Sequence, residues 1–205
     1  MDPNSFPTKG NLILAKNSLT LAKQGYELMD KKRNILIREL MELIDQAEDI
    51  QGEILETYET AYRALEQANI ELGINYVTEA ASAVPCENSI KIKSRSIMGV
   101  EIPHIEVDDN GIAPTYSFYG STESLDRARL AFEKVKVLSV KLAAIENSAY
   151  RLATNVKKTQ KRANALQNIT IPKFTELVKN ISNALEEKER EEFTRLKVIK
   201  RRMGE

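Results

Sequence analysis

The chain has 205 residues, of which 29% are charged and only 6% aromatic, and it contains no tryptophan. This composition argues against an ordinary compact globule and is typical of an elongated protein that exposes most of its surface. The 30 basic and 30 acidic residues give a formal net charge of zero, which argues against binding of nucleic acid through a generally cationic surface.

Three features of the sequence bear on its location. Cys86 is the only cysteine, so no intrachain disulfide can form, which suits a reducing compartment. The apolar runs are a few residues long, far below the ~20 residues that cross a bilayer. The N-terminus, with Asp2 and Pro3, lacks the pattern of a signal peptide. We expect a soluble cytoplasmic protein that associates with a membrane only through its partners.

Two long stretches of the sequence carry a heptad repeat. In the first stretch, one mainly apolar row recurs every seventh residue over 12–68, and a second row follows three places later over 15–64. The same pattern returns over 135–166. Rows with this spacing form the a and d seam of a coiled coil. Arg33 lies at an a position of the first stretch and departs from the apolar pattern.

The first helix is expected to begin after Thr8, a favourable N-cap residue, and to run to about Ala81, because this stretch contains no proline. Four glycines interrupt it, and each costs up to ~1 kcal/mol against alanine. They are Gly10, Gly25, Gly52 and Gly73. Tertiary packing can tolerate them; alternatively, Gly25 and Gly52 allow another chain to approach closely.

The second helix is expected from about residue 122 to 202. Pro172 interrupts its pattern, because a proline inside a helix removes one hydrogen bond and clashes with the preceding turn. We predict a kink or short break at 168–172. A reversal of the chain is not expected, because apolar positions resume at Phe174 and continue to Leu185.

The middle of the chain changes from helical to alternating periodicity. We predict a β-hairpin that pairs roughly 88–95 with 97–107, followed by a loop that returns to the second helix, with a strong turn signal at Asp108-Asp109-Asn110-Gly111. The chain then divides into a coiled-coil helix at 1–81, a hairpin and connecting loop at 82–121, and a second coiled-coil helix at 122–205, within one elongated unit.

The charge distribution predicts that the two helices pair with each other. Residues 39–71 hold ten acidic residues and one basic residue, whereas 128–160 hold seven basic residues and two acidic ones. An antiparallel hairpin of helices places these segments opposite each other, and flanking charges of opposite sign select orientation and partner. The predicted fold is therefore mainly α, a long antiparallel left-handed two-helix coiled coil with a short β-hairpin in the central insertion.

The first helix carries an apolar stripe that a two-helix seam does not need. It occupies the e positions Ile37, Ile44, Gln51, Tyr58, Leu65 and Leu72. A stripe of a, d and e positions is wider than the contact with one neighbouring helix. Either the hairpin segment folds back over the distal end of this stripe, or a partner protein docks along the middle of the coiled coil.

The sequence offers no catalytic, cofactor-binding or metal-binding constellation. It has one histidine, His104, one cysteine, and no glycine-rich phosphate loop. The basic C-terminal residues 197–202 are interpreted as complements to the negative end of a helix dipole, with nucleic acid or an anionic membrane as the alternative.

Several short motifs resemble the D-subunit family of V-type and A-type rotary ATPases. They are the opening Pro7-Thr8-Lys9, the central Ile97-Met98-Gly99-Val100 with Ile102-Pro103, and the stretches at 158–166 (KTQKRANAL), 171–172 (IP) and 185–197 (LEEKEREEFTRLK). The resemblance spans nearly the whole chain, in the order and spacing of the family.

This resemblance implies a non-catalytic rotor subunit of the central stalk, on the cytoplasmic face of a membrane. Family members insert their two termini into a hexamer of A and B subunits and couple ATP synthesis or hydrolysis there to ion transport through a membrane ring. The small F subunit docks on the coiled coil, and the funnel-shaped C (or d) subunit joins its other end to the ring. The hairpin has been linked to stimulation of the hexamer.

The resemblance also yields candidate interface residues. Ile37, Ile44, Tyr58 and Leu65 are candidates for the surface that meets the F subunit. Candidates for the end that meets the hexamer are Lys9, Lys16, Arg195, Lys197 and Lys200. Two other classes remain open, a prefoldin-like chaperone and a generic coiled-coil tether. The first has helices about half as long with apolar tips, whereas these tips are rich in charge, and the second predicts homodimers with no cognate partner.

Overall fold

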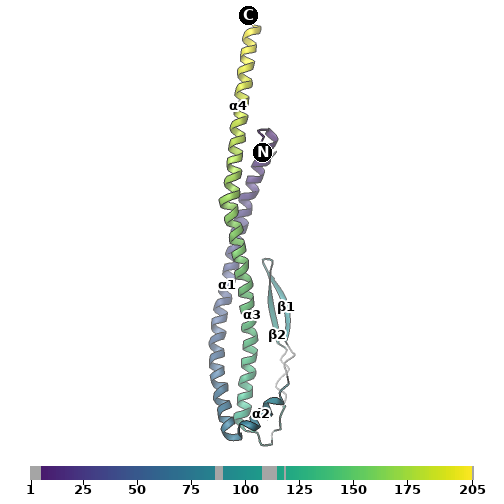
Figure 1. Ribbon diagram of the computed structural model, residues 1–205, viewed down its shortest axis with the longest axis vertical. Helices are drawn as coiled ribbons and strands as arrows, with labels where there is room; N and C mark the ends of the chain where they lie inside the picture. Colours follow the sequence, from purple (N-terminus) through teal and green to yellow (C-terminus); the bar gives the residue numbers. More distant parts are fainter. Residues whose placement is uncertain (1–5, 86–89, 108–114, 118, 205) are drawn as a thin grey trace. The chain divides into compact units, whose positions relative to one another are not determined.

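The computed structural model describes residues 6–85, 90–107, 115–117 and 119–204. Figure 1 shows the ribbon, coloured along the sequence. The chain divides into two compact units. Unit 1 combines the two ends of the chain, Met1–Asn34 and Val156–Glu205, and unit 2 contains Ile35–Asn155. Each unit is described by itself.

Helix α1 spans Lys9–Leu72 and begins as predicted. The backbone N–H of Asn11 donates to Oγ1 of Thr8 at 3.1 Å, which confirms Thr8 as the N-cap. The expected continuation to Ala81 is wrong, because α1 ends at Leu72 and a separate helix α2 follows at Ile74–Ser82. Gly73 separates them with φ +82° and ψ 148°, a combination of backbone angles that essentially only glycine adopts.

The second helical stretch is interrupted but does not reverse. Helix α3 spans Glu123–Ala165, a π-helical turn follows at Leu166–Thr170, and α4 spans Ile171–Met203. Pro172 lies in the first turn of α4. The wider π turn replaces α-helical hydrogen bonding just where Pro172 lacks an N–H to donate. The predicted break is wrong, because the helical stretch continues through the π turn, whereas the expectation that the chain does not reverse here is confirmed.

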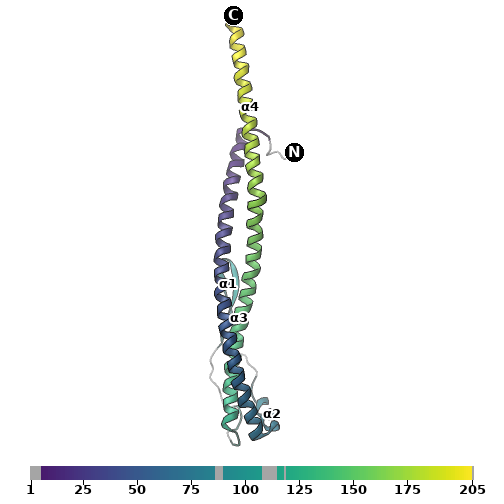
Figure 2. The ribbon, with the colours of Figure 1, turned by 90° about the vertical axis from the view of Figure 1, so that its left-hand side faces the viewer.

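Unit 1 is an antiparallel pair of helices, the first part of α1 against α3, the π turn and α4 (Figure 2). Lys9 contacts Glu189, and a Cβ added at Gly25 would lie 3.8 Å from Leu166. The residue numbers of the contacts thus fall along the second stretch as they rise along α1, which is the antiparallel arrangement. The core is lined mainly by small residues of the heptad rows. Its buried apolar residues are Ala15, Ala22, Ala163 and Ile181.

Arg33 forms a polar layer within the seam of unit 1. Its Nη1 donates to Oε1 of Gln160 at 2.9 Å, and its Nη2 lies 2.5 Å from Oδ1 of Asp30. Nη2 also donates to Oδ1 of Asn34, and Gln160 donates onward to Asn164. A charged residue at an a position is thus satisfied by hydrogen bonds, and such layers specify register at some cost in stability.

Unit 2 is also built on antiparallel helices, the remainder of α1 against the first part of α3. Oε1 of Glu53 contacts Nζ of Lys134 at 2.8 Å, which joins the acidic and basic segments as predicted. Other charges in these segments pair within one helix, such as Arg63 with Glu59. The opposite charges therefore favour antiparallel pairing more through long-range electrostatic attraction between the two segments than through individual salt bridges between the helices.

The short helix α2 packs against the end of this helix pair. Val77 and Ala80 of α2 are buried with Ala68 of α1 and Leu125 of α3. The gain from burying these residues explains why the chain turns at Gly73 and does not extend α1.

The predicted hairpin is confirmed, with shifted ends. β1 spans Ile90–Ile97 and β2 spans Val100–Val107 in an antiparallel ladder that opposes Ile97 to Val100. The two-residue turn has positive φ at both Met98 (50°) and Gly99 (77°), as in a type I′ hairpin. The expected turn at residues 108–111 lies outside the described residues.

Candidate docking surfaces

The described residues contain no group of three or more His, Cys, Asp or Glu side chains that could hold a metal ion. Among the described helices, none is long and apolar enough to cross a membrane. Apolar and charged side chains remain exposed outside the helix seams in several places.

The hairpin covers one side of the helix pair in unit 2. A groove between them is lined by Leu43, Gln46 and Ile50 of α1, by 141–148 of α3, and by hairpin residues that include Ile102. These α1 residues occupy d and g positions, on the opposite side of the seam from the e positions. The hairpin thus packs away from Ile44.

The predicted e stripe has two different fates. Ile37 and Ile44 remain 39% and 38% exposed. The ring of Tyr58 stacks on Tyr62 with centroids 5.8 Å apart, and Leu65 packs against the cluster under α2. The expected cover by the hairpin is therefore wrong for this stripe: α2 covers its far end, while its near end stays open.

Met41 extends the open part of the stripe and was not included among the stripe residues predicted from the sequence. Its side chain is 54% exposed and lies four residues after Ile37 and three before Ile44, on the same side of α1. We call Ile37, Met41 and Ile44 the middle stripe. Its i, i+4, i+7 spacing was readable from the sequence, but Met41 occupies a b position, outside the rows that the heptad pattern singles out.

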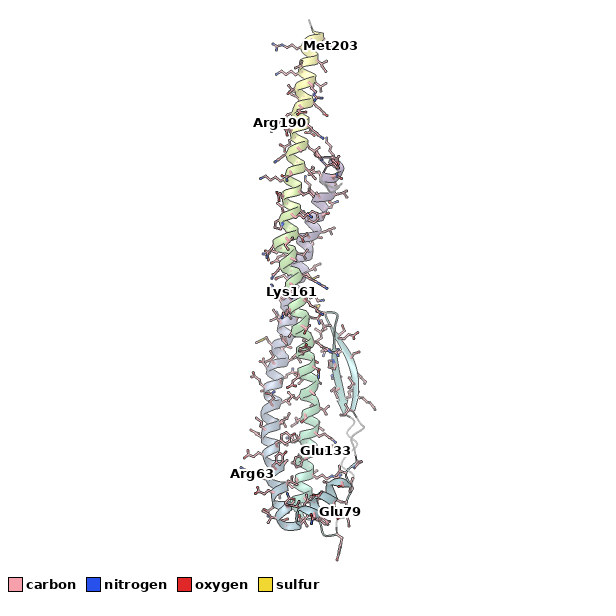
Figure 3. The ribbon with its side chains drawn as sticks, in the orientation of Figure 1. Arg63, Glu79, Glu133, Lys161, Arg190 and Met203 are labelled. Atoms are coloured by element: carbon pink, nitrogen blue, oxygen red, sulfur yellow. The ribbon has the colours of Figure 1, made fainter. Side chains whose placement is uncertain are left out.

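The C-terminal part of α4 is exposed on every side. All residues of 186–204, the C-terminal extension, have exposed side chains, and Figure 3 shows them pointing outward between Arg190 and Met203. Phe193, Leu196 and Ile199 form an exposed apolar row at helical spacing. An apolar row of this kind without cover in its own unit is typical of a surface that another chain contacts.

The five charged candidates all lie on the surface of unit 1. Nζ of Lys9 is 3.3 Å from Oε1 of Glu189, and Nη2 of Arg195 is 3.8 Å from Oε2 of Glu191. Lys16, Lys197 and Lys200 are exposed. Exposed pairs of this kind contribute little to stability, so these charges can change partners at little cost.

The end of unit 2 near α2 forms a third surface. A half-open apolar cavity of about 380 Å³ lies between α2 and α3 beside Tyr116. The Tyr116 hydroxyl donates to Oδ1 of Asp126 at 2.5 Å, and the guanidinium of Arg129 lies 5.2 Å from the ring centroid. Burial and the neighbouring Asp126 raise the pKa of Tyr116.

A polar cluster closes the same end of the helix pair. The Ser124 hydroxyl donates to Oε2 of Glu71 at 2.5 Å, and Gln67 donates to the other carboxylate oxygen. The hydrogen bond from Ser124 is the largest cause of a lowered pKa of Glu71, followed by those from Gln67 and Thr122.

Antiparallel heptad helices with exposed apolar rows outside their seams are typical of a coiled-coil protein that assembles with other chains. The family model for the D subunit of ATP synthase matches residues 11–201. The chain belongs to this ATP synthase D-subunit family, and it is one of the subunits of a V/A-type ATP synthase.

Relatives from three organisms share this similarity over nearly the whole chain. The D subunit of the V-type ATP synthase of Thermotoga neapolitana is 47% identical over 198 residues, covering 97% of this chain and 98% of the relative. The D subunit of the A-type ATP synthase of Pyrococcus horikoshii is 36% identical over 95% of this chain and 92% of its own length. That of Halorubrum lacusprofundi is 34% identical, with 95% and 86% covered.

Proposed function

We propose that the chain is the non-catalytic rotor shaft of the complex. In this role it couples ATP synthesis or hydrolysis in a hexamer of A and B subunits to ion transport through a membrane ring. The observation that carries the proposal is the C-terminal extension. A single helix that is exposed on all sides and carries an apolar row is stabilised by a partner, and in this proposal the A/B hexamer surrounds it. The inner wall of the hexamer would contact the five charged candidates, Lys9, Lys16, Arg195, Lys197 and Lys200.

Two further partners are assigned to the other surfaces. The F subunit docks on the middle stripe, whose spacing matches the apolar face of one helix. The C (or d) subunit receives the end formed by α2 and links the shaft to the ring. The chain lies on the cytoplasmic face and reaches the membrane only through these partners. Nucleic acid has no part in this function, in line with the zero net charge.

A single-molecule rotation assay tests the proposal. Glu79 of α2 is exposed, so a Cys86→Ser/Glu79→Cys variant offers one thiol for a biotin and a gold bead. The A/B hexamer, assembled with this variant and the F subunit, is fixed to glass and supplied with ATP. We expect stepwise rotation of the bead in one direction. Sustained ATP hydrolysis with a bound but stationary bead would refute the proposal.

A truncation supplies the matched comparison. Removal of 186–204 deletes only exposed side chains, so the thermal unfolding of the remaining coil should change little. Coupling between ATP hydrolysis and rotation should be lost, because the part of the helix assigned to the A/B hexamer is absent. A truncated chain that still drives regular rotation would show that the extension is not where torque is transmitted.

A further inference from the structure

The outer edge of β1 has backbone groups directed away from β2. Within the described part of the chain the sheet consists of β1 and β2 alone. The two-residue turn makes Ile97 and Val100 a hydrogen-bonded pair, and pairs alternate from there along the ladder. Ile92, Ser94 and Ser96 therefore direct both N–H and C=O outward, whereas Lys93 and Arg95 bond to β2.

The corresponding edge of β2 is already occupied. Nη1 of Arg151 donates to the outward carbonyl of Glu101 at 3.1 Å, and Oγ of Ser148 lies 3.4 Å from that of Pro103. Pro103 has no N–H to offer. Figure 1 shows β2 on the side of α3 and β1 on the far side. The hairpin is thus anchored through β2, and β1 is the strand that another chain can reach.

The side chains of β1 match this arrangement. Every residue from Ile90 to Ser96 is exposed, and Ile92 is 71% exposed. Ile90 and Ile92 lie two residues apart, so their side chains share one face of the sheet. An exposed edge that carries large β-branched residues is a ready template for a further strand.

The charges of β1 select the occupant. Lys91, Lys93 and Arg95 alternate along the strand, and β1 contains no acidic residue. A second copy of β1 would bring like charges together across the new ladder, which is destabilising. Lys93 contacts Glu106 at 2.6 Å, but this pair is exposed and exchangeable.

We propose that the outer edge of β1 binds an extended, acidic segment of a partner protein as a third strand. Its backbone pairs with Ile92, Ser94 and Ser96, its apolar residues lie beside Ile90 and Ile92, and its alternate carboxylates face the three cations. The proposal rests on the geometry of the hairpin and holds whether or not the chain turns as a rotor.

Hydrogen exchange of the full-length chain tests the proposal at single residues. The probe is a capped octapeptide of alternating Val and Glu, with a Val/Lys peptide of the same length as control. We expect exchange of the Ile92, Ser94 and Ser96 amides to slow at least about tenfold, while the Lys93 and Arg95 amides, already bonded to β2, change little. Equal slowing in both sets, or slowing by the Val/Lys peptide, would overturn the proposal.

Two variants at one position separate edge pairing from general contact. Ser94→Pro removes an outward N–H, and the hairpin already contains a proline, Pro103, at the opposing position. Ser94→Ala keeps the N–H. We expect peptide affinity to fall about fivefold or more in the proline variant and to be unchanged in the alanine variant.

The same variants examine the alternative of self-association. Full-length chain that sediments as a dimer, and becomes a monomer with Ser94→Pro, would assign the edge to a second copy and overturn the proposal. Equal peptide affinities of the proline and alanine variants would also overturn it. Weakening of the Val/Glu complex by added salt is expected, because the cations of β1 are exposed.

Discussion

The polar layer at Arg33 makes a prediction about stability that can be worked out from its contacts. In Gln160→Leu, Arg33 loses an acceptor at 2.9 Å. A hydrogen bond to a charged group contributes about 1.5–3 kcal/mol. The Arg33 side chain is 25% exposed and keeps Asp30, so water compensates in part. We expect the free energy of unfolding to fall by about 1 kcal/mol.

The double variant Arg33→Leu/Gln160→Leu should behave in the opposite way. It loses an ion pair with Asp30 that is partly exposed and contributes at most about 1 kcal/mol. A leucine at an a position contributes about 1.5–3 kcal/mol when buried. Because the hydrogen bond between Arg33 and Gln160 is lost as well, the double variant should be as stable as the wild-type chain or more stable by about 1 kcal/mol, in the range found when buried polar layers are replaced by apolar ones.

Urea unfolding followed by helical circular dichroism measures both changes, with unchanged m-values as the control for a common unfolded state. Sedimentation velocity is the second readout, because loss of the layer should permit other registers and oligomers. A double variant no more stable than Gln160→Leu would refute the reasoning. It would mean that the layer stabilises the coil outright and does not trade stability for register.

Three further predictions concern other parts of the chain. Ile44→Glu should weaken binding of the F subunit at least about tenfold in calorimetric titration, because docking would bury an unpaired carboxylate. The circular dichroism of the free chain should be unchanged. An affinity equal to that of the wild-type chain would show that the middle stripe is not the docking face. Gly73→Ala should lower the free energy of unfolding by about 1–2 kcal/mol because of its positive φ. Gly52→Ala, in a helix interior with open space around it, should raise that free energy by up to about 1 kcal/mol, and equal signs in urea melts would contradict this contrast. Ser124→Ala should raise the pKa of Glu71 toward its ordinary value in an NMR titration. A pKa that is lower in the folded than in the unfolded chain contributes stability above the unfolded pKa, and this contribution is lost as the pH falls through the folded pKa. The variant should therefore be less stable than the wild-type chain at neutral pH but equally stable in strong acid.

Heptad spacing was sufficient to predict the two helical stretches, because a seam of a and d residues must be buried against another helix. The opposite charges of 39–71 and 128–160 then predicted that the two stretches pair with each other in antiparallel orientation. The alternation before Gly99 likewise predicted the hairpin. The break at Gly73 was not predictable in the same way. A glycine inside a helical pattern can be tolerated or can end the helix, and the packing of Val77 and Ala80 against α3 decides between them.

The candidate surfaces show the same limit. The e stripe was visible in the sequence, but its division into a covered part at Leu65 and an open part at Ile44 depends on where α2 turns back. The side of the seam that the hairpin covers was equally hidden. It depends on contacts between residues far apart in the sequence, such as the one between Arg151 and Glu101.

The π turn has a consequence for the phase of the heptad repeat. Continued at strict seven-residue spacing from Leu166, the d row would reach Lys173 and Asn180, which are exposed, whereas the buried residue is Ile181. A π turn accommodates one extra residue, and the seam after it is shifted by one position. The turn thus acts as a skip residue that returns the downstream apolar row to the seam. Deletion of one residue within 166–170 would bring the apolar rows before and after the turn into one uniform heptad repeat, but Pro172 would still lack an N–H to donate inside the helix.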